Sequence, residues 1–137
     1  MPPRRQFIAL AIALLGSTRT SAQGSQVEYQ VDLKARWGGT AHEGEVEAAP
    51  RKLIQMFGQP LLNDGDSESL GTYVFSTNDG TVLTLYRRAY DVSKQQVEAL
   101  RADFWQQKQE VEFHIGAKRA HDVPQFKAWL VKRLAQR

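Results

Sequence analysis

The strictest pattern in the chain is an alternation of apolar and polar residues over residues 27–37. Every odd position from Val27 to Trp37 is apolar, and every even position is polar. A period of two places the two sets of side chains on opposite faces of an extended strand. We therefore predict one long strand with one buried face, ended by Gly38 and Gly39, whose charged outer row limits unwanted pairing of its edge.

Three helices are expected in the remainder of the chain. The first begins at Pro50, which suits a first helical position, and ends at Gly58, which suits a C-terminal cap. Val46 and Ala49 would extend its apolar stripe if it began earlier. The second helix covers residues 93–108 and carries a capping box of Ser93 and Gln96, with Val97, Leu100 and Phe104 as its buried stripe. The last begins at a capping Asp122 and buries Val123, Phe126, Leu130 and Leu134.

Two further segments are predicted to form strands. Residues 71–86 favour a hairpin, because two β-rich runs flank Asn78-Asp79-Gly80, whose residues tolerate the positive φ of a tight turn. Residues 110–116 alternate, with Val111, Phe113 and Ile115 on the inward face. The order is β-α-β-β-α-β-α. It predicts an α+β fold: a two-layer sandwich of about four mostly antiparallel strands, with two or three helices on one face.

The first 22 residues have the layout of an export signal. Two arginines precede a short apolar run, and small residues then lead to an expected cut after Ala22. This run is too short to span a bilayer. The stretch Arg4-Arg5-Gln6-Phe7-Ile8 resembles a twin-arginine signal, and the general secretory route stays open as the alternative. We expect residues 1–22 to be a signal peptide and residues 23–137 to form one small domain that is periplasmic or secreted.

Removal of this leader changes the charge of the chain. The whole sequence has 18 Lys and Arg against 15 Asp and Glu, and three of the arginines lie in the leader. The mature chain would therefore be formally neutral, which gives no electrostatic reason to expect nucleic acid or a membrane as a partner. No stable membrane insertion is expected after cleavage. The chain has no cysteine, so its stability must come from packing without disulfides.

Three short stretches in the second half carry a resemblance to known proteins. They are Phe57-Gly58-Gln59-Pro60, the hairpin ending in Thr84-Leu85-Tyr86, and Phe113-His114-Ile115-Gly116-Ala117-Lys118. Residues 50–135 resemble a group of small uncharacterised α+β proteins of phage and bacterial genomes. Such proteins often carry Trp where Phe113 stands and a second Gly where Ala117 stands. The resemblance implies a fold of sheet and helices, and it implies no particular activity.

The strongest candidate for a ligand site is the segment from Gly116 to Asp122. A strand ends there, cations and a histidine follow, and a helix begins, so its amides could receive an anion. A capping Asp122 would oppose such binding, because its carboxylate would occupy the same amides. The predicted ligand-binding residues are Lys118, Arg119, His121, His114, Arg87 and Arg88.

Two tryptophans are candidate anchors for a protein partner. Trp105 and Trp129 each lie about one residue away from the central stripe of their helix. Aromatic residues at such places usually belong to the core or its rim, and they are also enriched at binding hot spots.

Patterns typical of metal, cofactor or catalytic sites are not found. His42-Glu43-Gly44-Glu45-Val46-Glu47 lacks the second histidine of the helical zinc pattern, and residues 63–68 lack the ligand spacing of an EF-hand. There is no nucleophile elbow and no glycine-rich phosphate loop. We therefore expect no metal and no cofactor, and no catalytic residue can be named.

Three classes of function remain open. The leading prediction is a non-catalytic binding or interaction domain of the bacterial envelope, with another protein as its partner. The first alternative is a binder of a small anion or other ligand that uses residues 116–122. The second is an enzyme whose site is assembled from residues far apart in the sequence.

Overall fold

One antiparallel sheet and three α-helices form the part of the chain that the computed structural model describes, residues 27–62, 66, 68–89 and 92–136. The expected leader, residues 1–22, lies outside the described residues. In chain order the elements are β1 (Gln30–Val31), β2 (Ala41–Ala48), α3 (Pro50–Phe57), β3 (Ser69–Ser76), β4 (Val82–Arg88), α4 (Lys94–Phe104), β5 (Val111–Ala117), the 3-10 helix η3 (Ala120–Asp122) and α5 (Val123–Leu134).

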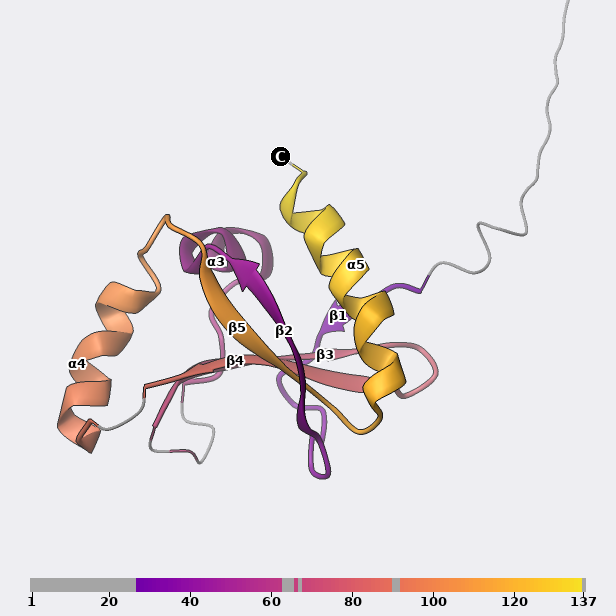
Figure 1. Cartoon of the computed structure of the whole chain (residues 1–137), viewed down its shortest axis with the longest axis horizontal. Coiled ribbons are helices and arrows are strands. Elements are labelled where there is room, and N and C mark those ends of the chain that lie inside the picture. Colours follow the sequence, from indigo (N-terminus) through magenta and orange to yellow (C-terminus); the bar gives the residue numbers. More distant parts are fainter. Residues whose placement is uncertain (1–26, 63–65, 67, 90–91, 137) are drawn as a thin grey trace, which may run out of the picture.

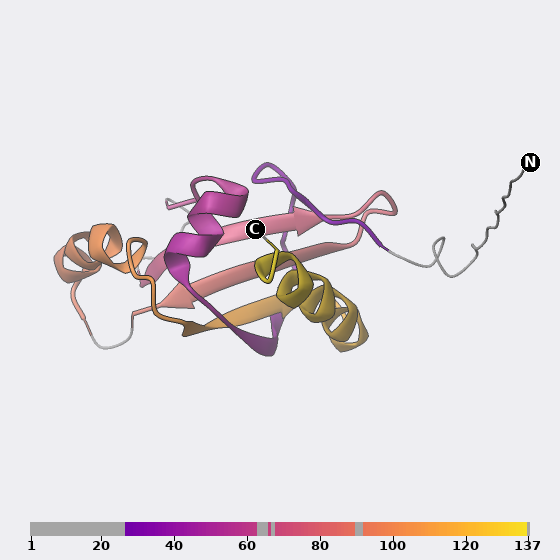
Figure 2. The same ribbon diagram turned by 90° about the horizontal axis from the view of Figure 1, so that it is seen from above.

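The sheet has the strand order β1-β3-β4-β5-β2, with every pair antiparallel. Helices α3 and α5 lie over one face, and α4 packs at one end of the sheet (Figures 1 and 2). The predicted α+β class is confirmed, with five strands in place of about four. Among the described residues, no helix is both long enough and apolar enough to cross a bilayer.

The long strand predicted over residues 27–37 is wrong in extent, because only the two residues of β1 pair with β3. The remaining outer edge of β3 is already occupied. The carbonyl of Val74 accepts the N–H of Asp32 at 2.7 Å, and Leu61 bridges Thr72 through two backbone hydrogen bonds. An extended chain that continued past Asp32 would have to displace Leu61 to find partners for its backbone.

The chain therefore turns at Asp32. The Asp32 carboxylate accepts the N–H of Lys34 at 3.2 Å, and the Asp32 carbonyl accepts the N–H of Ala35 at 3.0 Å. Asp side chains favour such local turns because they bond to the backbone two residues on. The connection over residues 32–40 then passes to the face of the sheet that α3 and α5 leave open (Figure 1).

An eight-residue strand, β2, lies at the sheet edge where no strand was predicted. Its inward residues Gly44, Val46 and Ala48 alternate with exposed glutamates, so the period of two is present. The inward residues are small, which makes the apolar signal weak. A Cβ on Gly44 would lie only 2.7 Å from the Val123 side chain, so the close approach of α5 explains a small residue there.

The boundaries of α3 and the start of α4 follow the predicted caps. Pro50 stands at the start of α3 as expected. The Ser93 hydroxyl accepts the N–H of Gln96 at 3.2 Å, and the Gln96 side chain accepts the N–H of Ser93 at 2.7 Å, which confirms the capping box of α4. This helix ends at Phe104, before the predicted residue 108, and Leu100 is 44% exposed where a buried position was predicted.

An aromatic cluster joins the helices to the covered face of the sheet. Ring centroids in it lie 5.0–6.2 Å apart, a spacing typical of edge-on and offset aromatic pairs. The Tyr73 hydroxyl also donates to the carbonyl of Gly58 at 2.6 Å, which fixes the end of α3 against β3. The members are Tyr29, Phe57, Tyr73, Phe75, Phe126 and Trp129.

Candidate functional site

The predicted strand–loop–helix site at residues 116–122 is an exposed loop with an internal ion pair. Lys118 and Arg119 follow β5 into solvent. The prediction that Asp122 caps α5 is wrong, since its side chain makes no capping hydrogen bond. Its backbone is already helical (φ −77°, ψ −17°), whereas a capping residue is extended. Its carboxylate instead accepts from Arg119 at 3.3 and 3.4 Å, and His121 lies 3.5 Å from it.

The structure separates the other predicted ligand residues from this loop. Because β4 and β5 are antiparallel, Leu83 pairs with Ala117 and Tyr86 pairs with His114. Arg87 and Arg88 therefore lie about 17 and about 20 Å from Lys118, at the opposite end of β5, given a rise of about 3.3 Å per residue. The expectation that Arg87 and Arg88 reach the end of the sheet where Lys118 lies is wrong.

The two tryptophans differ in their surroundings. Trp105 is 8% exposed and donates its indole N–H to the carbonyl of Leu70 at 2.7 Å, so it belongs to the core. Trp129 is only partly buried. It packs on the aromatic cluster and also lines a surface groove of about 440 Å³ between residues 27–28 and α5.

A polar pocket of about 250 Å³ lies on the open face of the sheet, under the connection that joins β1 to β2. Segments from four parts of the chain meet there. The lining residues are Trp37, Thr40, Ala41, Asp66, Thr72, Thr84, Tyr86, Arg88 and Gly116. Of the predicted ligand residues, only Arg88 is among them.

The pairing of the strands determines which residues form the floor of this pocket. Thr72 lies opposite Tyr86, and Thr84 lies opposite Gly116, so these positions share one face of the sheet. A Cβ on Gly116 would overlap the Thr84 hydroxyl. The absence of a side chain at residue 116 therefore leaves room for that hydroxyl at the floor.

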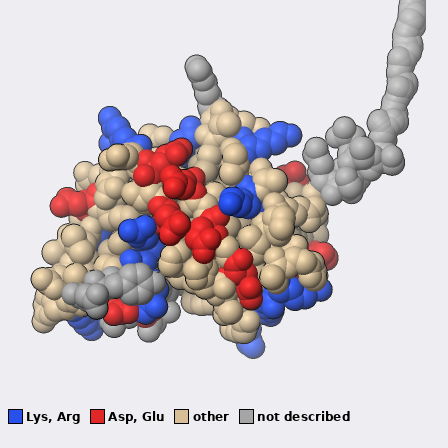
Figure 3. Space-filling view, viewed as in Figure 1, with Lys and Arg blue, Asp and Glu red and all other residues tan. Residues whose placement is uncertain are grey.

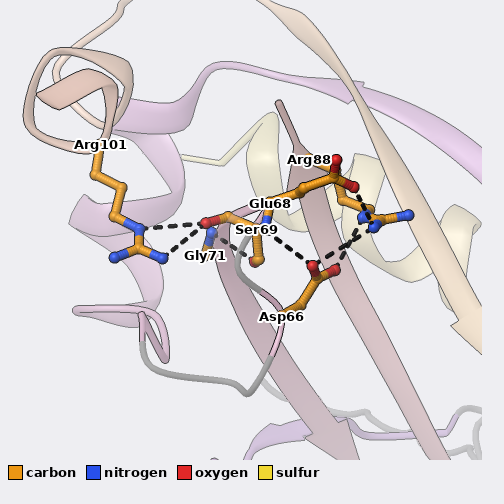
Figure 4. A network of polar contacts seen from close by, with 6 residues as sticks. All are labelled: Asp66, Glu68, Ser69, Gly71, Arg88 and Arg101. Atoms are coloured by element: carbon orange, nitrogen blue, oxygen red, sulfur yellow. Dashed lines mark hydrogen bonds and ion pairs between the residues drawn. The ribbon is translucent and has the colours of Figure 1, made fainter. Parts of the chain in front are cut away.

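Two residues of the pocket lining, Asp66 and Arg88, belong to an ion-pair network (Figure 4). The Arg88 guanidinium contacts Asp66 at 2.8 Å through Nε and Glu68 at 2.6 Å through Nη2. On the other side of the same segment, Arg101 of α4 donates twice to the carbonyl of Ser69, at 3.0 and 3.2 Å. The two arginines thus fix the start of β3 between the sheet face and α4.

A pair of stacked histidines adjoins the pocket. The rings of His42 and His114 are 4.3 Å apart and inclined by 12°, and Tyr86 meets His114 edge-on at 5.5 Å. His42 lies 2.6 Å from Glu45, and His114 lies 3.9 Å from Glu112. His114, a predicted ligand residue, therefore contacts the pocket wall through Tyr86.

Acidic side chains follow the neighbouring sheet edge. Glu43, Glu45 and Glu47 of β2 and Glu112 of β5 are all exposed. Figure 3 views the molecule from this edge and shows a band of acidic side chains across it. The region beside the pocket therefore carries negative charge.

Sequence reasoning missed the pocket although β4 contains a signal for it. Thr84, Tyr86 and Arg88 alternate with the buried Leu83 and Leu85. Polar residues on the second face of a central strand indicate a surface that is not covered by apolar packing. That signal identifies the face, but it does not show that the connection at residues 32–40 lies over it.

The pocket combines hydroxyls, aromatic rings and an ion pair, which together suit a small polar molecule. Within the described ranges, no group of three or more His, Asp or Glu side chains is placed to hold a metal ion. Compared with models of known protein families and with curated proteins, the chain matches none.

Proposed function

We propose that the chain is a small exported binding domain without a catalytic role, which holds a small polar molecule in the pocket on the open face of its sheet. Export rests on the layout of residues 1–22. Binding rests on the pocket, where hydroxyl, aromatic and charged side chains from separate segments converge. Convergence of a few polar groups in a concave site is the usual character of a small-molecule site.

The position of Thr84 at the floor of the pocket is the observation that carries this proposal. Thr84 is only 3% exposed although it lies on the open face, and its hydroxyl occupies the space that a side chain at Gly116 would fill. A ligand hydroxyl or amine that lies at this floor would hydrogen-bond with the Thr84 hydroxyl, which can both donate and accept.

The test uses residues 23–137 dialysed against the small-molecule fraction of the exporting cells, followed by native mass spectrometry. We expect a bound mass that is lost in Thr84→Val, a change that removes the hydroxyl and keeps the side-chain shape. Ser76→Ala is the matched control, since Ser76 lies on the same face of β3 outside the pocket lining. Equal retention by Thr84→Val and by the unchanged protein would contradict binding in this pocket.

A protein partner at the Trp129 groove is the second candidate function. This groove is lined by Val27, Ala128 and Trp129 together with charged residues of α5, and an aromatic side chain in a concave surface is a frequent anchor. Ala128 is exposed, so Ala128→Glu would fill the groove with charge without disturbing the core. Partner capture that is unchanged by Ala128→Glu would exclude this groove.

A further inference from the structure

The groove along α5 is lined by two cations that have no carboxylate partner. Lys132 and Arg133 both line it, and neither forms an ion pair with another side chain in the described part of the chain. Among the described residues of the lining, Glu28 is the only acidic one, and it is exposed. Two cations against one carboxylate leave the lining with one net positive charge.

Arg133 is the better placed of the two cations to hold an anion. Its Nε atom is buried and has no hydrogen-bond partner among the described residues, and its Nη1 reaches Gln136 Oε1 only at 3.4 Å. The Arg133 Cζ atom lies 5.9 Å from the ring centroid of Trp129, which is within the range of a cation–π contact and fixes the guanidinium beside that ring. A partly buried guanidinium without a carboxylate partner is stabilised when an anionic acceptor binds beside it.

The rest of the groove favours an apolar group next to that anion. Val27 and Trp129 pack against the core while they also line the groove, and the exposed Ala128 lies beside them in the lining. The volume of about 440 Å³ equals that of roughly 15 liquid water molecules, at about 30 Å³ each, which leaves room for a ring as well as a carboxylate. A ligand with an apolar body would remove this wall from water, whereas a bare inorganic anion would not.

We propose that this groove binds a small organic carboxylate with an apolar body, whose carboxylate lies at Arg133 and Lys132 and whose apolar body covers Val27 and Trp129. The groove shares no lining residue with the pocket at Thr84, so this second site is independent of the ligand proposed there. A small molecule is favoured over a protein partner because the unpaired cations and the apolar wall lie within one groove of this size.

The proposal also moves the anion predicted from the sequence. That prediction places an anion at residues 116–122, where the Arg119 guanidinium already contacts the Asp122 carboxylate at 3.3 Å. Arg133 has no such carboxylate among the described residues, so the cation that is available to an anion lies on α5.

The experiment is a titration of the ¹⁵N-labelled protein, residues 23–137, with sodium phenylacetate, phenylacetamide, sodium acetate and N-acetylglycylphenylalanine in separate series at constant ionic strength. We expect saturable shifts with phenylacetate at the Ala128 amide, the Trp129 indole N–H and the Arg133 Nε–H. Phenylacetamide lacks the charge and acetate lacks the ring, so each should bind about tenfold more weakly than phenylacetate.

Arg133→Gln should weaken phenylacetate binding by about tenfold, since it removes the charged donor. Lys132→Gln, a change at an exposed position, should weaken it by about threefold and serves if Arg133→Gln does not fold. Lys127→Gln is the matched control, because Lys127 is an exposed cation of α5 outside the groove lining, and it should leave the affinity within about twofold.

Several results would overturn the assignment of a small carboxylate to the groove. They are the absence of groove shifts with phenylacetate, equally tight binding of phenylacetamide, and equal losses of affinity in Lys127→Gln and Lys132→Gln. Binding of N-acetylglycylphenylalanine more than about tenfold tighter than phenylacetate would instead favour the chain end of a protein partner. Phenylacetate shifts confined to Thr84 and Gly116 would place the carboxylate in the other pocket. None of these results removes the ligand proposed at Thr84, which Thr84→Val tests separately.

Discussion

His114 is a titratable side chain whose surroundings favour its neutral form. Burial is the main cause that holds the pKa of His114 below the usual 6.5, and the charges of His42 and Arg87 act in the same direction. Glu112 and Glu45 oppose this shift, although they do not reverse it. The neutral ring can therefore stay stacked on His42 under conditions in which an exposed histidine would begin to take up a proton.

The free energy of unfolding should therefore depend on pH through this residue. Because the pKa of His114 is lower in the folded state, the unfolded chain binds the proton first as the pH falls. The contribution of His114 to the free energy of unfolding is present above pH 6.5 and is lost as the pH falls through the pKa of His114 in the folded state. Urea midpoints measured between about pH 7.5 and about pH 5 should decrease, and less steeply in His114→Phe. An unchanged slope in His114→Phe would show that other groups are responsible.

Trp105 should be the more critical of the two candidate tryptophans for stability. Trp105→Phe removes the indole donor and leaves the buried carbonyl of Leu70 without that partner, at a cost of roughly 1–3 kcal/mol. Trp129→Phe should cost less, because Trp129 is partly exposed. Chemical denaturation of both variants measures the difference. A larger loss in Trp129→Phe would contradict the assignment of Trp105 to the core.

Contacts between side chains that are close together in the sequence could be predicted, whereas contacts between residues far apart in the sequence were much less predictable. The pairing of Ser93 with Gln96 spans three residues, so backbone geometry alone brings them together. Arg88 and Asp66 are 22 positions apart, and only the pairing of β3 with β4 brings them into contact. For the same reason, the prediction from the sequence places Arg88 at the wrong end of β5.

At the scale of elements, the capping box of α4 gives a direct test. Ser93→Ala should lower the free energy of unfolding by about 1 kcal/mol, because the N–H of Gln96 loses its acceptor. Gln95→Ala, an exposed position in the first turn that keeps the box, should have almost no effect. Thermal or urea unfolding of both variants measures these changes in the free energy of unfolding. Equal losses of stability in the two variants would mean that the cap is not formed in solution.

The strands show why an apolar–polar period of two in the sequence is necessary but not sufficient for a β-strand to form. Residues 27–37 alternate strictly, and yet only Gln30 and Val31 pair, because the remaining edge of β3 is occupied. Residues 41–48 alternate weakly, and yet all of them belong to β2, because β5 offers a complete edge. A strand exists where a partner edge is available, which is a property of the whole sheet.

At the scale of the whole molecule, export can be tested apart from binding. The protein recovered from the periplasm or medium should have the mass of residues 23–137, with Gln23 as its first residue. Arg4→Lys combined with Arg5→Lys should retain the uncut chain in the cytoplasm if the twin-arginine route is used. Unchanged export of the double variant would instead indicate the general route. An uncut exported chain would contradict the cleavage expected after Ala22.

The sequence alone determined the α+β class, the start of α3, the capping box of α4 and the hairpin turn, since each depends on residues close together in the chain. Gly80, with φ of +88°, lies in the predicted turn between β3 and β4. The tertiary structure decided the short β1, the edge strand β2, the burial of Trp105 and the site itself. The pocket joins residues from Trp37 to Gly116, and strand pairing across such separations depends on which edges are free and which faces are covered.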